Sequence, residues 1–397
     1  MIYLIVIFTL LLLSFIYDIN GVQSKRDFWY RFMLLVFILL SGLRWRLGLD
    51  TTGYLFDFYH ECPTLNRFSF DDYSLFSNPL FVLLNSVVLT LGGKFYIVQL
   101  IHASFVNILI FKYIKKHTQF IFVCLFFYAI IAYSKYNMEI MKGSMSIVIC
   151  LYANDYILEK KWVKGYILYF IALLFHAQTI LLFFLPLLFT LKLNIKGLLV
   201  LVCAFMVGRI AMNLLGDYFF LFEVADDLGD KANTYMNSDK YSGQSGNVNF
   251  FIQKAVLDFV YPVLSLVYAK NKATNTEIIK LEPFVMISLF FVMIRASVEI
   301  AYRYVDYYYI YICLFYSNLF VNYCNPKRLY APLSFLRSLI IYIPFFFIGF
   351  GYSYIYNEEV RCRYYPYTTV FNRTVDHHRE ALFSLLSNYK EPNTNEY

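Results

Sequence analysis

The sequence predicts an all-α polytopic integral membrane protein with about 12 transmembrane helices. Of its 397 residues, 60% are hydrophobic and 15% are charged, whereas soluble domains average roughly half apolar and a quarter charged residues. The apolar residues are concentrated in blocks, and many blocks approach the roughly 20 residues that cross a bilayer. Because lipid offers the backbone no hydrogen-bond partners, we expect these blocks to be helical. Examples are 1–16, 120–132, 197–215 and 335–350.

The distribution of charge orients the chain. Short loops between the blocks carry clusters of lysine and arginine, and loops of this kind lie in the cytoplasm. The loops at about 44–78 and 216–249 are longer, and the second is rich in aspartate. We therefore expect both long loops and both termini outside the cytoplasm. The formal charge of +7 reflects this topology and gives no reason to expect nucleic-acid binding.

Two apolar segments are too short or too constrained to be ordinary spans. Residues 79–91 are too few to cross a bilayer and predict a re-entrant half-helix. Residues 163–191 have basic residues at both ends and predict a hairpin that turns near His176. The predicted organisation is one polytopic transmembrane domain, 1–355, followed by an extracytoplasmic tail, 356–397.

Within the tail, residues 376–388 predict a short amphipathic helix. The seven cysteines include no closely spaced pair, so the sequence predicts no metal site. Cys62 and Cys362 are both expected outside the cytoplasm, where a disulfide between them could form.

Charged and polar side chains gather where the predicted helices meet the outer face. Charges at membrane depth are costly and mark functional sites. Guanidinium groups bind phosphate through paired donors, and a carboxylate or an imidazole can accept a proton from a hydroxyl. We therefore predict a site for an anionic lipid headgroup with an acid–base group beside it. The candidate residues are Arg44, Arg46, Asp50, Tyr54, Lys142, His176, Arg295, Glu299, Arg303 and Asp306.

Each group of candidates has a purely structural alternative. Arg44 and Arg46 can reach lipid headgroups from a helix end. The charged residues between 295 and 306 would share one face of a helix, where they form either a site or an ion-pair ladder. Lys142 can be neutralised by Glu139, and His176 can bond backbone carbonyl groups of the hairpin.

Four motifs follow one another along the chain. They are Arg-Trp-Arg-Leu-Gly-Leu-Asp-Thr-Thr-Gly-Tyr at 44–54, Ser-Asn-Pro-Leu-Phe-Val-Leu-Leu-Asn at 77–85, Ile-Ala-Leu-Leu-Phe-His at 171–176 and Arg-Tyr-Val-Asp-Tyr-Tyr at 303–308. Taken in this order, they resemble the motifs of a known family, the EpsG-like branch of the Wzy-type O-antigen and capsule polymerases. The likeness covers roughly residues 1–350. In the segment at 141–144, Lys142 stands where the family commonly has an arginine.

The resemblance implies a membrane glycosyltransferase that joins undecaprenyl-diphosphate-linked repeat units at the outer face of the bacterial plasma (inner) membrane. One unit donates its glycan to a hydroxyl of another, and lipid diphosphate leaves without the help of a cofactor. By this resemblance Arg44, Arg46, Arg303 and Lys142 neutralise the leaving group. Asp50 or His176 deprotonates or positions the acceptor hydroxyl. Candidate partners are the bilayer, the lipid-linked glycans, a flippase and a chain-length regulator, with no nucleic acid.

Three other functions fit part of the pattern. A lipid-linked oligosaccharide flippase would also carry many spans and internal cations, but it should show two similar halves, and no such repeat is visible. A membrane O-acetyltransferase would need a histidine reachable from the cytoplasm, whereas His176 is expected on the other side. A membrane scaffold without catalytic activity is the third alternative.

Overall fold

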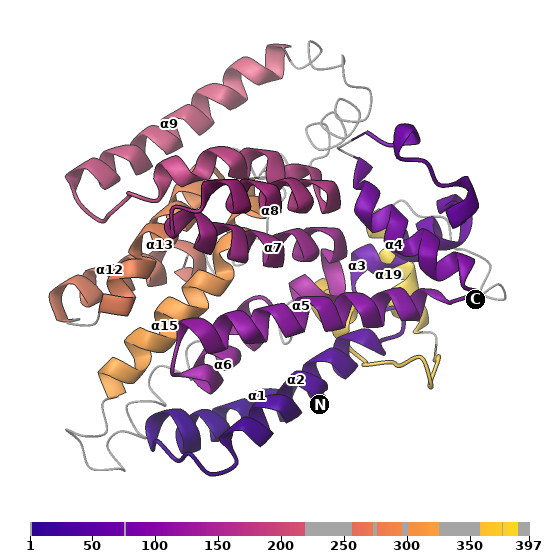
Figure 1. The fold of residues 1–397 in the computed structure, drawn as a ribbon, viewed down its shortest axis with the longest axis horizontal. Helices are drawn as coiled ribbons and strands as arrows, with labels where there is room; N and C mark the ends of the chain where they lie inside the picture. The colour runs from indigo at the N-terminus through magenta and orange to yellow at the C-terminus, as the bar shows by residue number, and fades with distance from the viewer. Residues whose placement is uncertain are drawn as a thin grey trace. The chain divides into compact units, whose positions relative to one another are not determined.

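The computed structural model describes residues 2–74, 77–218, 256–272, 276–295, 301–324, 358–374 and 376–387. These residues form helices joined by turns (Figure 1), and within them no β-strand occurs. Two isolated β-bridges link Arg44 to Thr369 and Thr369 to Asn372. The all-α prediction is therefore confirmed for the part of the chain that the structure describes.

The chain divides into two compact units. The first, called here the outer-chain unit, comprises residues 1–183 and 326–397, and the second, the middle unit, comprises residues 184–325. The helices of the outer-chain unit are α1 (Ile2–Leu13), α2 (Arg26–Gly42), α3 (Leu49–Phe56), α4 (Pro79–Thr90), α5 (Phe95–His117), α6 (Ile121–Ile131), α7 (Met141–Leu158), α8 (Trp162–Phe175), α18 (Glu358–Tyr364) and α19 (His377–Ser387). Those of the middle unit are α9 (Ile195–Tyr218), α12 (Tyr261–Lys272), α13 (Thr276–Arg295), α14 (Tyr302–Val305) and α15 (Tyr309–Cys324).

In the outer-chain unit α5 packs against both α2 and α7, and α7 packs against α8 (Figure 1). Buried polar groups link these helices to a π-helical turn, Lys135–Glu139. Asn107 donates to Asn137 of this turn at 2.6 Å, and Asn137 donates to the Tyr128 hydroxyl at 2.9 Å. Because buried amides must be paired, this network fixes the turn that leads into α7.

Apolar side chains also cover outward faces of the helices. On α2, Phe28, Phe32, Leu35 and Leu39 are 41–60% exposed and recur every three or four residues. On α8, Val163 is 75% exposed, and Ile167 and Phe170 follow on the same face. Soluble monomers rarely expose apolar stripes of this kind, whereas lipid would cover them at no cost.

The number of membrane spans is not confirmed by the structure. Among the described residues, two helices are long and apolar enough to cross a bilayer, Ile2–Ile19 and Phe95–His117. Several other apolar helices are shorter, including Trp162–Phe175. With 12 residues, α4 is about 18 Å long, well below the ~30 Å hydrocarbon core. The predicted half-helix is thus present as a helix, and its re-entrant placement stays a prediction.

The predicted hairpin is confirmed. Helix α8 ends at Phe175, and His176 takes an extended backbone conformation. The chain then returns along α8, because the Tyr166 hydroxyl donates to the Phe183 carbonyl at 3.3 Å and the Tyr169 ring lies 5.6 Å from the Phe183 ring.

The C-terminal segment, residues 358–387, packs on the arginine loop, residues 43–48, which connects α2 to α3. The Trp45 amide donates to the Thr368 carbonyl at 2.9 Å, and the Gly48 amide donates to the Arg363 carbonyl at 2.9 Å. Within the segment, Arg379 is 2% exposed and donates to the Cys362 carbonyl at 2.8 Å. The helix predicted at 376–388 is α19.

The proposed disulfide is wrong, since Cys62 and Cys362 are both free. Cys62 instead lies 3.5 Å from the Ser86 hydroxyl on α4. The C-terminal segment is attached to the arginine loop through backbone pairing and the buried Arg379, without a covalent link.

Gly48 has a positive φ of 91°, and a Cβ there would collide with the Met138 carbonyl group. Gly92 also has a positive φ, 71°, but no atom lies within 4 Å of the position of its Cβ. We expect Gly92→Ala to cost about 1–2 kcal/mol from backbone strain alone and Gly48→Ala to cost more than about 4 kcal/mol. Thermal unfolding of the two purified variants measures the difference, and equal losses would contradict the clash.

Candidate functional site

Helix α3 lies within the predicted outer loop 44–78 and forms the wall between two polar regions. The Asp50 amide, in the first turn of α3, donates to Glu139 Oε2 at 3.2 Å. The negative charge of this carboxylate complements the positive end of the helix dipole. Residues four apart share one face of a helix, and their neighbours in sequence point elsewhere. Thr51 and Leu55 therefore face one region, and Tyr54 faces another.

The first region is the lysine cluster, defined as Tyr54, Asp57, Phe81, Lys142 and His176. The Lys142 ammonium lies 3.9 Å from Asp57 Oδ2. It also lies 5.2 Å from the centre of the Tyr54 ring and 5.6 Å from that of Phe81. Glu139, the partner that the structural alternative gave to Lys142, accepts from the Tyr364 hydroxyl at 2.8 Å.

The His176 ring lies next to the other members of the lysine cluster because it packs on Gly143, the residue after Lys142. A Cβ at residue 143 would lie 3.3 Å from His176 Cδ2 and 3.5 Å from Nε2, so the ring packs directly on the start of α7. The Gln178 amide donates to His176 Nδ1 at 3.2 Å. Because this bond uses the lone pair of Nδ1, the neutral ring carries its hydrogen on Nε2. Nε2 is therefore placed as a donor.

The second and third motifs meet beside His176. Asn78, in the left-handed region with φ 57°, caps α4, and its side-chain oxygen accepts from the Ala177 amide at 3.2 Å. The motifs at 44–54, 77–85 and 171–176 and the segment at Lys142 thus converge on one place in the outer-chain unit.

The electrostatics of the lysine cluster single out Asp57. Burial raises the pKa of this carboxyl above its usual range, with Glu61 adding to the increase, while the Lys142 ammonium opposes it. Asp57 is 45% exposed at its side chain, so it is reachable from solvent. A reachable carboxylate of raised pKa beside a cation is the type of group that accepts a proton in catalysis.

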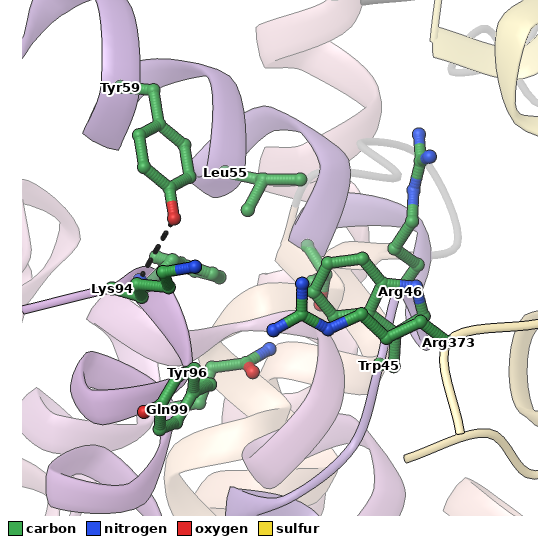
Figure 2. Close-up of a pocket in the computed structure, with 10 residues that line it drawn as sticks. Trp45, Arg46, Leu55, Tyr59, Lys94, Tyr96, Gln99 and Arg373 are labelled. Carbon is green, nitrogen blue, oxygen red and sulfur yellow. Dashed lines mark hydrogen bonds between the residues drawn. The ribbon is translucent and has the colours of Figure 1, made fainter. Parts of the chain in front are cut away.

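The second region is the arginine pocket, a hollow of about 380 Å³ including its open mouth. Its lining brings three cations together with aromatic rings and one amide, and it includes no carboxylate. In Figure 2, Tyr59, Lys94, Tyr96 and Gln99 lie on one side, and Trp45, Arg46 and Arg373 lie on the other. The lining residues are Trp45, Arg46, Thr51, Leu55, Tyr59, Lys94, Phe95, Tyr96, Gln99 and Arg373.

Side chains from the C-terminal segment organise the arginine pocket. The Arg373 guanidinium lies 4.8 Å from the centre of the Trp45 ring, within cation–π range. Arg46 is 8% exposed and pairs with Glu380 at 2.8 Å. Two buried donors, Arg46 Nε and Trp45 Nε1, have no hydrogen-bond partner. Buried donors without partners are rare in folded proteins.

Arg44 does not line this pocket. It is 0% exposed, and its guanidinium donates to the carbonyl groups of Ser41 and Leu47 and contacts the Met141 sulfur. The prediction that Arg44 binds substrate directly is not supported by this burial, and neither is headgroup contact. Arg44 instead holds the arginine loop against the start of α7. Asp50 is exposed on the first turn of α3.

Four other candidates belong to the middle unit, and the structure describes three of them. Arg295 ends α13 and pairs with Asp258 at 3.0 Å. Arg295 and Arg303 lie 5.9 and 6.0 Å from the centre of the Tyr302 ring, and Asp306 is 1% exposed. Arg303 belongs to a separate helix, α14, and Glu299 lies outside the described residues, so the structure does not show the predicted shared face.

The sequence comparison identifies the family. The model of the EpsG family matches residues 27–369. The chain belongs to the EpsG family. Among curated proteins no match is found, and among solved structures there is none either. EpsG membership and the apolar helices indicate a membrane protein with a polysaccharide polymerase-like role.

Asp57, Lys94, Gln99 and Arg373 were not among the candidates predicted from the sequence. Asp57 follows Tyr54 by one helical turn, a spacing that would have identified it had α3 been predicted. Lys94, Gln99 and Arg373 carry no such signal, because only tertiary packing brings them to the pocket. Among the described residues, no group of three histidine, cysteine or carboxylate side chains could hold a metal.

The burial of Arg44 yields a stability prediction. Arg44→Gln should destabilise the protein by at least about 2 kcal/mol, because buried carbonyl groups lose their donor. Arg373→Gln removes the same charge from an exposed position, and it should change the free energy of unfolding by no more than about 0.5 kcal/mol. Thermal unfolding in detergent compares the two, and an unchanged melting temperature for Arg44→Gln would restore Arg44 as a candidate for direct substrate contact.

Proposed function

We propose that this EpsG-family protein is a polysaccharide polymerase that joins undecaprenyl-diphosphate-linked repeat units by glycosyl transfer. The observation that carries the proposal is the lysine cluster. Three regions distant in sequence bring together the Asp57 carboxylate, the Lys142 ammonium and the His176 ring, which packs on Gly143 next to Lys142. Glycosyl transfer from a lipid diphosphate needs these groups, and the donor is already activated, so no nucleotide is required.

The chemical step follows from the arrangement. A hydroxyl oxygen of the acceptor glycan attacks the anomeric carbon of the donor, and the bond from that carbon to the diphosphate oxygen breaks. Lipid diphosphate leaves with the bonding electron pair. The Lys142 ammonium and the His176 Nε2–H stabilise the charge that develops on it. The hydroxyl proton passes to Asp57.

The roles differ from those expected from the sequence. The bond from Gln178 to Nδ1 makes His176 a donor, so it assists the leaving group and does not remove a proton. Asp57 replaces Asp50 as the base, because Asp57 lies beside Lys142 and is half-buried. Without Lys142, the pKa of Asp57 would rise further, and the acidic limb of the pH–rate profile would move to higher pH.

The substrates determine which face of the membrane carries this site. Lipid-linked units must be present on that face, and a bacterium displays them on the outer leaflet of its plasma membrane after transport. The arginine loop is backbone-paired to the C-terminal segment, so these two segments lie on the same side of the membrane. We place both on the outer face of a multi-pass plasma-membrane protein.

The surface polysaccharide of the host tests this function. Deletion of the gene should reduce the ladder on a gel to a lipid core carrying one repeat unit. Asp57→Asn should reproduce the deletion, because transfer loses its proton acceptor. Asp71→Asn, the same change at an exposed residue of the same outer segment, should restore the full ladder.

Protein levels in the membrane must match for the two variants. A full ladder with Asp57→Asn would remove Asp57 from the mechanism. Loss of all surface glycan in the deletion strain, with lipid-linked units retained inside the cell, would identify a flippase instead.

A further inference from the structure

The chemical step leaves the arginine pocket unused. The pocket and the lysine cluster lie on different faces of α3, since Thr51 and Leu55 line the pocket, while Tyr54 contacts Lys142. A helix with its side chains is roughly 10 Å across. A ligand held in the pocket is therefore too far from Asp57 to be the reacting group, but it can be another part of the same substrate.

The pocket has the chemistry of an anion site. Lys94 and Arg373 supply two cations and no carboxylate lines the hollow, while the third cation of the lining, Arg46, is paired with Glu380. The side chains of Lys94, Gln99 and Arg373 line the hollow from opposite sides and can donate hydrogen bonds to acceptor oxygens. A diphosphate offers several such oxygens, and arginine binds them through paired donors.

Part of this site lies outside the region that defines the family. The family match ends at residue 369, whereas Arg373 and Glu380 follow it in the chain. Arg373 forms the wall opposite Lys94 and Gln99 (Figure 2), and Glu380 holds the terminal nitrogen of Arg46. The buried Arg379 fixes the base of α19 by donating to Cys362 and Thr368. The C-terminal segment therefore supplies a rigid side of the pocket.

We propose that the arginine pocket binds the diphosphate of the second lipid-linked substrate, the acceptor, and that the C-terminal segment completes this site through Arg373. The identity of the ligand as a glycolipid rests on the proposed function. An acceptor attacks through a sugar far from its own diphosphate, so the two ends of one repeat unit can occupy the two faces of α3. Arg373 contacts the diphosphate, and Trp45 lies beneath it.

Trp45 provides a direct readout of this site. The chain has three tryptophans, and Trp29→Phe with Trp162→Phe leaves Trp45 as the only one. The full-length double variant, purified in detergent, is titrated with a short-chain polyprenyl diphosphate and with inorganic pyrophosphate while Trp45 fluorescence is recorded. Both probes should give a saturable change. Glucuronate, an acidic sugar without phosphate, should give none at the same concentrations.

Variants of the same background test the role of the segment. Arg373→Gln should raise the Kd for both diphosphates at least tenfold, and so should Lys94→Gln on the opposite wall. Arg361→Gln, an exposed arginine of α18 that does not line the pocket, should change the Kd less than twofold. Equal melting temperatures show that these variants are folded.

Several results would overturn the inference. They are an unchanged Kd in Arg373→Gln, the absence of any Trp45 response, or a response to glucuronate as strong as that to pyrophosphate. The last outcome would identify a site for an acidic sugar. A full polysaccharide ladder in the deletion strain, together with Arg373-dependent diphosphate binding, would instead refute the polymerase proposal and leave the binding site standing.

Discussion

The contact between Gly48 and the Met138 carbonyl is the constraint on which both polar regions depend. It brings the arginine loop against the π-helical turn before α7, and the backbone at Gly48 then turns into α3 with φ 91°. A side chain at this point would separate the two segments. Because Lys142 lies in the first turn of α7, shortly after Met138, and Tyr54 lies on α3, shortly after Gly48, this approach brings Lys142 and Tyr54 together.

Buried arginines support the same junction from both sides. Arg44 fills the space beneath the loop and bonds its carbonyl groups, while Arg379 does the same for the turn at 362–368. A buried guanidinium is tolerated only when its donors find acceptors. The guanidinium groups of these two residues therefore hold backbone segments together. Of the cations that line the pocket, Arg46 is paired with Glu380, while Lys94 and Arg373 lie on opposite sides of the hollow.

The sequence predicted the helical class, the hairpin at His176 and helix α19, because each depends on a local pattern of apolar or turn residues. It did not predict α3, whose eight residues are too few to form a helix without tertiary contacts. Without α3 the proximity of Asp57 to Lys142 could not be seen. Arg373 could not be predicted for a related reason, since it reaches the pocket through pairing between segments more than 300 residues apart.

The arrangement explains how one short helix can serve a reaction between two large glycolipids. One face of α3 presents the groups that move a proton and stabilise a leaving diphosphate, and the other presents a cationic pocket closed by the C-terminal segment. The EpsG family model covers the first face completely and the second only in part.

Reconstitution tests the central claim most directly. The purified protein in lipid vesicles is supplied with undecaprenyl-diphosphate-linked repeat units, and both released lipid diphosphate and new glycosidic linkages are counted across pH. We expect one lipid diphosphate to be released for each linkage. We also expect Lys142→Met to move the acidic limb of the pH profile to higher pH, because the pKa of Asp57 rises. Linkages formed without release of lipid diphosphate, or a pH profile unchanged by Lys142→Met, would contradict the central claim.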